Sequence, residues 1–244
     1  MNYLNTRPLA YGIEHSPVMK EIEYSGDYPS RLARQLIEGT IDIGLVPVAV
    51  IPYLPTHYIN TDFCIGTEDE VASVCLFSDV PIEEVDTVLM DYQSRTSVAL
   101  AKLLLREHWK LSPAIVPTEN DYRPLIKGKT AGLVIGDRCL EQRSKSKYIY
   151  DLGSEWKRHT GLPFVFAAWV SREQLDPTFV AAFNEANAEG VRNIDKVLQT
   201  IDYKHYDLGK YFHQNLSYPL NSKKREGLSL FLEKIRSEAL VPVR

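Results

Sequence analysis

A helix that ends at glycine and enters a strand through Gly-Leu-Val is predicted twice in this chain. The two copies are LIEGTIDIGLV at residues 36–46 and LIKGKTAGLV at residues 125–134. This junction is common in α/β proteins, but here the copies lie in opposite halves of the chain. We therefore expect an α/β protein in which each half builds its own small parallel sheet.

The hydrophobic pattern around these junctions alternates between strand-like and helix-like segments. Strands are expected at residues 19–25, 41–51, 85–91, 113–118 and 131–137. Helices are expected at residues 29–39 and 94–109, and a long helix is expected after Asp176-Pro177, where an N-cap precedes proline at the first helical position.

Two further apolar runs, residues 71–78 and 162–171, are suitable for crossing between two sheets. The first run would leave the N-terminal lobe and the second would return to it. We therefore expect lobe 1 to combine residues 1–83 and 166–244, and lobe 2 to comprise residues 84–165. Open α/β sheets bind ligands beyond the carboxyl ends of their strands, so the predicted ligand site is the cleft between the lobes.

Composition excludes several classes of partner. With a net charge of −4, the chain has no general attraction for nucleic acid or anionic membranes, and its short basic run at residues 223–225 is interpreted as a solvated helix face. No apolar stretch is long enough to span a membrane, and the first 30 residues contain no secretion signal, so a cytoplasmic protein is expected. The three cysteines form no metal-binding or redox pair, and the sequence gives no indication of oligomeric state.

The segment DYQSRTS, residues 91–97, is the most informative of the predicted cleft loops. Ser94 or Thr96 can cap the helix that begins there, and the free N–H groups of its first turn can bind an anion. Arg95 adds a planar guanidinium suited to a carboxylate. The alternative is an ordinary cap with a solvent-facing arginine. Together with the other polar cleft loops, this segment favours a small carboxylated or phosphorylated ligand.

Familiar catalytic motifs are missing from the sequence. It contains no G-x-S-x-G, H-E-x-x-H, Walker or G-x-G-x-x-G pattern, so acyl transfer, zinc hydrolysis and nucleotide chemistry have no support. His159, beside Thr160-Gly161, is the one histidine placed near the cleft. Asp91 and Asp137 are expected to end strands at the cleft rim, where a cap or hinge partner is commoner than a proton shuttle.

Five ordered motifs carry a family resemblance: NYLNTRPL, GTIDIGLVPV, SRTSVALAKLLL, GLVIGD and YDLGSEWKRHTGLPFVFAAW. Together they resemble the chorismate dehydratases of the futalosine route to menaquinone. The resemblance implies a two-lobed periplasmic-binding-protein-like fold of type 2, with a ligand cleft between the lobes. It also implies a lyase that removes water from chorismate to give 3-[(1-carboxyvinyl)oxy]benzoate, with no metal or organic cofactor.

By this resemblance, Asn5 is the expected catalytic residue, donating a hydrogen bond to a substrate carboxylate or to the departing hydroxyl. The residues expected to bind the substrate are Thr6, Val46, Ser73, Ser94, Arg95, Thr96, Ser97, Asp137, Thr160 and Gly161. Elimination requires a base within reach of the ring proton, and the cleft motifs offer no obvious side chain for this role. Our hypothesis is that the substrate's own side-chain carboxylate accepts the proton.

Two other functions share these features. The sibling enzyme that forms 1,4-dihydroxy-6-naphthoate has a similar fold but a different N-terminal motif, and a non-catalytic binding protein for small carboxylates would have the same cleft. In this chain Met1 directly precedes the Asn2–Leu9 motif, so the first strand, which we expect to end at Asn5 and Thr6, is expected to be short.

Overall fold

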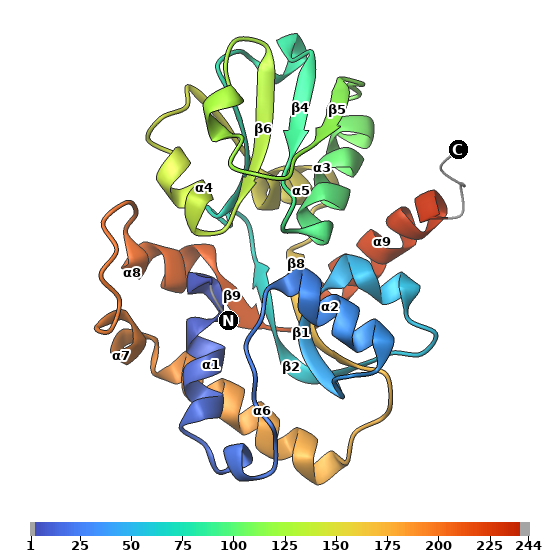
Figure 1. Cartoon of the computed structure of the whole chain (residues 1–244), viewed down its shortest axis with the longest axis vertical. Coiled ribbons are helices and arrows are strands. Elements are labelled where there is room, and N and C mark those ends of the chain that lie inside the picture. Colours follow the sequence, from blue (N-terminus) through green and yellow to red (C-terminus); the bar gives the residue numbers. More distant parts are fainter. Residues whose placement is uncertain (1–2, 240–244) are drawn as a thin grey trace.

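Two β-sheets, one above the other, form the framework of the computed structural model, which describes residues 3–239 (Figure 1). The lower sheet has four strands in the order β1 (Ile43–Pro47), β8 (Phe164–Ser171), β2 (Tyr58–Thr67) and β9 (Ser217–Pro219). The upper sheet has five strands in the order β5 (Ala114–Pro117), β4 (Thr87–Met90), β6 (Thr130–Ile135), β3 (Val74–Ser78) and β7 (Tyr148–Asp151). The predicted α/β class is confirmed.

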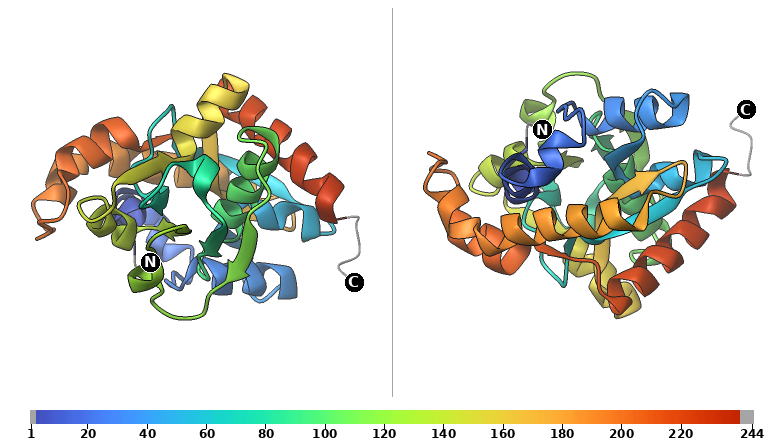
Figure 2. Two further views of the ribbon diagram at one scale, coloured as in Figure 1. Left: turned by 90° about the horizontal axis from the view of Figure 1, so that it is seen from above. Right: turned by 90° about the horizontal axis from the view of Figure 1, so that it is seen from below.

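Helices flank both sheets. They are α1 (Arg7–Glu14), α2 (Pro29–Glu38), α3 (Arg95–Glu107), α4 (Asp137–Gln142), α5 (Leu152–Thr160), α6 (Pro177–Arg192), α7 (Ile194–Leu198), α8 (Leu208–Lys210) and α9 (Ser222–Ala239). Figure 2 shows α6 and α9 along the underside of the molecule, where α6 packs against β2 and α9 against β8. α1 and α6 approach so closely that a Cβ atom on Gly12 would lie 1.9 Å from the carbonyl oxygen of Ala186.

The strand directions correct the expectation of two small parallel sheets. In the four-stranded sheet, β8 is antiparallel to β1 and β2, and β2 is antiparallel to β9. In the five-stranded sheet, β4 is parallel to β5 and β6, whereas β3 is antiparallel to β6 and β7. The lower sheet is antiparallel rather than parallel because β8, which returns from the upper sheet, runs between β1 and β2 in the direction opposite to both.

The chain passes between the sheets twice. It leaves the lower sheet after Thr67, enters the upper sheet at Val74, and returns between Thr160 and Phe164. β3 therefore pairs in the upper sheet although it precedes residue 84. The division into lobe 1, residues 1–83 with 166–244, and lobe 2, residues 84–165, stays a prediction. Near the return, Trp156, Phe164 and Phe231 pack edge to face, with ring centroids 5.0–6.0 Å apart, and carry the core across the junction.

The strand expected at residues 19–25 does not form. Residues Pro17–Lys20 are a 3₁₀ turn, and residues 21–25 line a cavity of about 920 Å³ that also borders β1. Among the described strands β1 pairs with β8 alone, so residues 21–25 do not extend the sheet. Tyr24 Oη and Gln35 Oε1 are buried without a hydrogen-bond partner among the described residues.

The two predicted helix–glycine–strand junctions also differ from each other. Gly39 ends α2 in the left-handed conformation, with φ of 75°, as expected. Before Gly128, however, only a 3₁₀ turn at Arg123–Leu125 forms, so the second junction lacks the predicted helix. Its polar, proline-containing sequence DYRPLIKG supports one turn but offers no apolar face of helical length.

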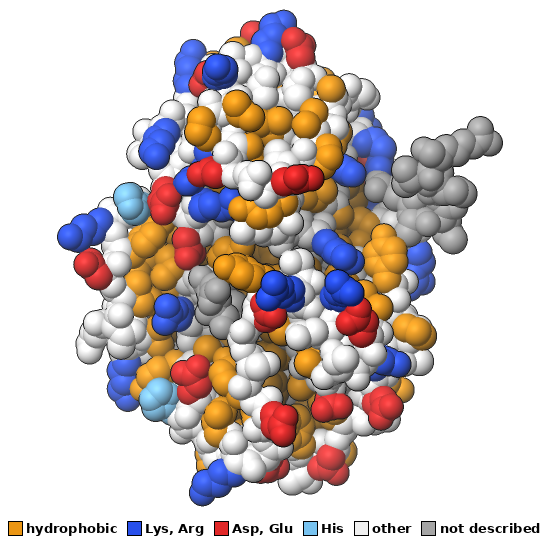
Figure 3. Space-filling view, viewed as in Figure 1, with side chains coloured by type: hydrophobic (Ala, Val, Ile, Leu, Met, Phe, Trp, Pro, Cys, Tyr) orange, Lys and Arg blue, Asp and Glu red, His pale blue; other side chains and the backbone are white. Residues whose placement is uncertain are grey.

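The basic run near the C-terminus is not a uniformly solvated face. Lys224 is fully buried, and its Nζ donates to the carbonyl oxygen of Pro219 at 2.7 Å and lies 3.1 Å from Glu68 Oε1. Elsewhere, basic and acidic side chains are interspersed on the face shown in Figure 3. None of the described helices has the length and apolar character required to cross a membrane.

Candidate active site

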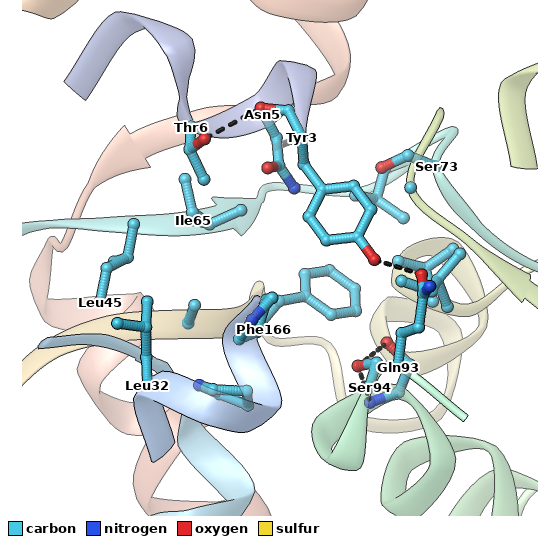
Figure 4. Close-up of a pocket in the computed structure, with 18 of the residues that line it drawn as sticks. Tyr3, Asn5, Thr6, Leu32, Leu45, Ile65, Ser73, Gln93, Ser94 and Phe166 are labelled. Atoms are coloured by element: carbon cyan, nitrogen blue, oxygen red, sulfur yellow. Dashed lines mark hydrogen bonds between the residues drawn. The ribbon is translucent and has the colours of Figure 1, made fainter. Parts of the chain in front are cut away.

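A cavity lies where the two sheets meet, and both sheets contribute to its walls (Figure 4). Its polar lining residues are Tyr3, Asn5, Thr6, Asp27, Ser73, Gln93, Ser94 and Ser97, and its apolar ones include Leu32, Leu45, Ile65, Val71, Val74, Ile135 and Phe166. Polar groups thus converge on a largely apolar chamber, which is the usual construction of a small-molecule site.

Asn5 reaches the cavity from a 3₁₀ turn, Leu4–Thr6, rather than from the end of a strand. Residues 1 and 2, where the short first strand would begin, lie outside the described residues. Pro8 occupies the first turn of α1, so Arg7-Pro8 opens a helix directly behind the turn. The hydroxyl of Tyr218 donates to the carbonyl oxygen of Asn5 at 2.9 Å, which fixes the backbone independently of the side chain.

The side chain of Asn5 is available to a ligand. Its Oδ1 is buried and has no hydrogen-bond partner among the described residues. Leaving a buried amide oxygen unpaired is unfavourable, so this acceptor marks a place for a hydrogen-bond donor such as a hydroxyl group, while the NH₂ group of the same amide can donate to a carboxylate. Thr6 is less available, because its Oγ1 already donates to the carbonyl oxygen of Tyr3 at 2.9 Å.

The start of α3 forms the opposite wall. Ser94 Oγ accepts from the backbone N–H of Ser97 at 3.1 Å and donates to Ser97 Oγ at 2.9 Å, so the predicted serine cap is confirmed. Both serines line the cavity, which therefore faces the N-terminal end of a 13-residue helix. The positive end of the helix dipole favours an anion there.

The structure does not bring Arg95 to this wall. Arg95 is exposed and is absent from the cavity lining, as the alternative of an ordinary cap with a solvent-facing arginine predicts. Thr96 points away as well, because its buried Oγ1 accepts from the backbone N–H of Ala49 at 3.2 Å. It therefore anchors α3 on the 3₁₀ turn Val48–Tyr53.

The remaining predicted residues also lie outside the lining. Val46 is buried in β1, and Thr160 and Gly161 end α5, where Gly161 has a φ of 76°. Asp137 begins α4, and its Oδ1 accepts from the backbone N–H of Leu4 at 3.2 Å, which ties the N-terminal turn to the upper sheet. His159 lies 3.6 Å from Glu107 and does not line the cavity.

Tyr3 and Gln93 line the cavity but were missed from the sequence. The hydroxyl of Tyr3 donates to Gln93 Oε1, so a residue of the N-terminal turn bonds to the loop after β4 (Figure 4). A Cβ atom on Gly136 would lie only 2.6 Å from the Tyr3 ring, so glycine is needed where that ring packs. The available signals were the position of Tyr3 two residues before Asn5 and the position of Gln93 in the predicted cleft loop 91–97.

A buried ionic network holds Gln93 from behind. Arg138 Nη2 donates to Gln93 Oε1 at 3.0 Å and to Asp91 Oδ2 at 2.8 Å. Burial raises the pKa of Asp91, whereas its hydrogen bond from the Gln93 N–H and the charge of Arg138 oppose that rise. Asp91 therefore supports the cavity wall through its bonds to Gln93 and Arg138 and does not face the ligand.

Carboxylates near the cavity are few. Among the described lining residues Asp27 is the single carboxylate, and its Oδ1 accepts from the N–H of Tyr28 at 2.7 Å. Burial raises the pKa of Asp137, just outside the lining, to about 6, although its bond from Leu4 opposes the rise. Within residues 3–239 no group of three His, Cys, Asp or Glu side chains has the arrangement of a metal site.

The sequence profile of a family described as menaquinone biosynthesis matches residues 1–237, which include every segment that lines the cavity. The chain belongs to this family. Two of its similar relatives are chorismate dehydratases. The enzyme of Thermus thermophilus is 28% identical over 228 residues, covering 84% of this chain and 83% of the relative. That of Campylobacter jejuni is 26% identical over 242 residues, covering 96% and 94%.

Solved structures identify the fold of this family member. A protein from Archaeoglobus fulgidus superposes with a TM-score of 0.75 at 14% identity, covering 97% of this chain and 95% of that one. The alkanesulfonate-binding protein of Xanthomonas axonopodis pv. citri superposes with a TM-score of 0.60 at 11% identity, covering 98% and 92%. The expected periplasmic-binding-protein-like fold is confirmed.

Proposed function

We propose that this protein is a carbon–oxygen lyase that dehydrates chorismate to 3-[(1-carboxyvinyl)oxy]benzoate in the futalosine route of menaquinone biosynthesis. The observation that carries the proposal is the family match over residues 1–237, which spans all the cavity walls. The names of the Thermus and Campylobacter relatives support the same reaction. A biosynthetic role on chorismate also favours the cytoplasm as the site of action.

The cavity suits a dicarboxylate with an unsaturated ring. Ser94, Ser97 and the helix start offer hydrogen-bond donors and a positive dipole to one carboxylate. At the other end of the substrate, where the reaction takes place, Asn5 offers its side-chain amide. Ser73 and Thr6 also line the cavity. We propose that the ring lies among the apolar lining residues near Phe166, where water is excluded.

The reaction breaks two bonds of the substrate. A proton leaves the ring carbon that carries the enolpyruvyl ether, the hydroxyl group leaves the ring as water, and the electrons of the C–H bond complete the aromatic ring. We propose that the enolpyruvyl carboxylate accepts the ring proton and passes it to the departing hydroxyl group, which leaves as water, while Asn5 holds the substrate in the reactive pose. The scarcity of ionisable side chains in the described lining supports this assignment.

Asp27 provides the test of the base, because it is the carboxylate in the described lining. If the substrate supplies the base, Asp27→Asn keeps the wild-type dependence of rate on pH and most of the wild-type kcat. Loss of a kinetic pKa together with most of the activity in this variant would instead make Asp27 the general base.

Incubation with chorismate, followed by mass spectrometry for loss of one water, tests the function itself. Formation of 3-[(1-carboxyvinyl)oxy]benzoate supports the proposal. Saturable binding without turnover would make the protein a binder of small carboxylates, and turnover of a cyclic futalosine derivative alone would identify it as the sibling enzyme. Parallel assays of Asn5→Ala and Arg95→Ala compare the buried amide with the exposed guanidinium.

A further inference from the structure

The chain crosses from the lower to the upper sheet through an unusual turn at residues 71–73. Ala72 has a φ of 62°, in the left-handed region that disfavours a side chain with a Cβ atom. The N–H of Ser73 donates to the carbonyl oxygen of Val71 at 2.8 Å, so the turn is closed over three residues. A residue held in this conformation needs surroundings that enforce it.

Asp151, at the end of β7, supplies much of that enforcement. Its Oδ2 accepts from the N–H of Ala72 at 2.7 Å, and its Oδ1 accepts from the N–H of Val71 at 3.0 Å. Oδ1 also caps α5 by accepting from the N–H groups of Gly153 and Ser154. One buried carboxylate therefore joins the crossing turn to the first turn of a helix.

The carbonyl side of Ala72 is held from the same lobe. Arg143 Nη1 donates to the carbonyl oxygen of Ala72 at 3.1 Å, and Cys139 Sγ lies 3.3 Å from the same oxygen. Arg143 in turn donates through Nη2 to Glu70. The backbone N–H and the carbonyl oxygen of Ala72 are thus both bonded to side chains that belong to the upper half of the molecule.

The turn matters because its two flanking residues face the cavity. Val71 and Ser73 both line it, and the carbonyl oxygen of Ser73 accepts from the N–H of Gly136, another lining residue, at 2.8 Å. With a φ in the common region, Ala72 would turn the chain differently and move Val71 or Ser73 out of the wall. The left-handed conformation therefore defines this part of the site.

We propose that Asp151 is a positioning residue for the dehydration: its Oδ2 holds Ala72 in the left-handed conformation that presents Val71 and Ser73 to the substrate. This proposal rests on the proposed function. Asp151 does not line the cavity and acts through the backbone of residues 71–73.

The carboxylate geometry allows a selective substitution. In Asp151→Asn, the amide oxygen can take the place of Oδ1 and keep the α5 cap, because asparagine caps helices as well as aspartate does. The NH₂ group then faces the N–H of Ala72, which loses its acceptor, and Arg143 Nη1, which lies 3.8 Å from Oδ2 and loses a distant charge partner. We expect kcat/KM for chorismate to fall by about 10-fold to 100-fold, the scale of a misplaced site wall.

Ala72→Gly supplies the decisive second change, since glycine adopts a positive φ without steric penalty. If Asp151 acts by holding this conformation, the Asp151→Asn/Ala72→Gly double variant recovers kcat/KM at least about threefold over Asp151→Asn alone. Glu155→Gln is the matched control: Glu155 is also buried in α5, but it bonds to His108 and does not contact the turn. Its kcat/KM should stay near that of wild type.

The outcomes separate the two proposals. If wild-type protein forms no product from chorismate, the proposed function fails. If wild type turns over and Asp151→Asn matches it, or if Asp151→Asn is impaired while the glycine gives no recovery, the positioning role is refuted although the function stands. Circular dichroism at the assay temperature verifies that all three variants are folded, and a folded, impaired and glycine-rescued Asp151→Asn supports the inference.

Discussion

Replacing Asn5 with alanine removes the amide that we place against the reacting end of the substrate. A hydrogen bond to a charged group contributes about 1.5–3 kcal/mol, and each 1.4 kcal/mol corresponds to about tenfold. The backbone of the turn should remain in place, because Tyr218 bonds to the carbonyl oxygen of Asn5 rather than to its side chain. We therefore expect kcat/KM for chorismate to fall by about 10-fold to 150-fold.

The same substitution should not destabilise the free protein. Asn5 Oδ1 is buried without a partner among the described residues, and such an acceptor costs about 1–3 kcal/mol relative to one that is paired. Alanine removes that cost but also a few side-chain contacts. The melting temperature of the ligand-free protein should stay the same or rise, by about 2–4 °C for each kcal/mol gained.

Steady-state formation of 3-[(1-carboxyvinyl)oxy]benzoate and thermal unfolding by circular dichroism measure the two effects. Asn184→Ala is the control, because Asn184 lies on α6, bonds to the exposed N–H of Asp62 and is not among the cavity-lining residues. Unchanged kcat/KM in Asn5→Ala would refute the placement of the substrate. A melting temperature lowered by several degrees would show that the amide is structural instead.

Three further substitutions test the surroundings of the site. Tyr3→Phe removes the bond to Gln93, a loss of about 0.5–1.5 kcal/mol, and should raise KM for chorismate about 2-fold to 10-fold; an unchanged KM would contradict it. Burial raises the pKa of Asp137 to about 6, so the folded state binds this proton more tightly and stability falls as pH rises from about 4 to 6. Asp137→Asn should therefore gain stability relative to wild type across that window in urea titrations, and a constant difference would refute this. Lys224→Met removes the ammonium donor of the Ser217 and Pro219 carbonyl oxygens and should lower the unfolding free energy by about 1–3 kcal/mol, whereas exposed Lys223→Met should leave it unchanged; equal effects would contradict the burial argument.

Features that depend on neighbouring residues in the chain were predicted well. Ser94 caps α3, Asp176 caps α6 by accepting from the N–H groups of Thr178 and Phe179, and Gly39 ends α2 with a positive φ. Each is decided by hydrogen bonds within one turn of the chain. Local sequence is sufficient for such features because their partners are fixed by spacing.

Features that depend on the partner strand were predicted poorly. Residues 19–25 alternate as a strand should, but in the structure they pair with no strand, and residues 21–25 line a cavity beside β1. The direction of β8 could not be obtained from its apolar sequence, because a fully buried strand looks the same in a parallel and an antiparallel sheet. Lys224 was predicted to face solvent, because runs of charged residues usually do. In the structure it is buried, and its ammonium group donates to carbonyl oxygens of β9.

The candidate site divides in the same way. Asn5, Thr6, Ser73, Ser94 and Ser97 lie together on the cavity wall. Tyr3, Gln93 and Phe166 also line it; they lie within the quoted motifs and the loop 91–97 but were not singled out, and the bond between Tyr3 and Gln93 joins residues distant in sequence. Residue type alone favoured Arg95 as the carboxylate partner, whereas the direction of a side chain on the first turn of a helix depends on how that helix is packed.

Two locally unfavourable features of this structure, each of which lowers the free energy of unfolding, lie at the cavity. Asn5 keeps a buried acceptor unpaired, and Ala72 holds a left-handed conformation that glycine would adopt more easily. Packing alone requires neither, since alanine at position 5 and glycine at position 72 would relieve both. If these costs serve the site, relieving them should separate stability from activity: Asn5→Ala should gain or keep stability and lose turnover. Ala72→Gly keeps the turn, so it should gain stability and lose little turnover. This difference between the two variants would assign the Asn5 amide to the chemistry and the Ala72 turn to the geometry of the site.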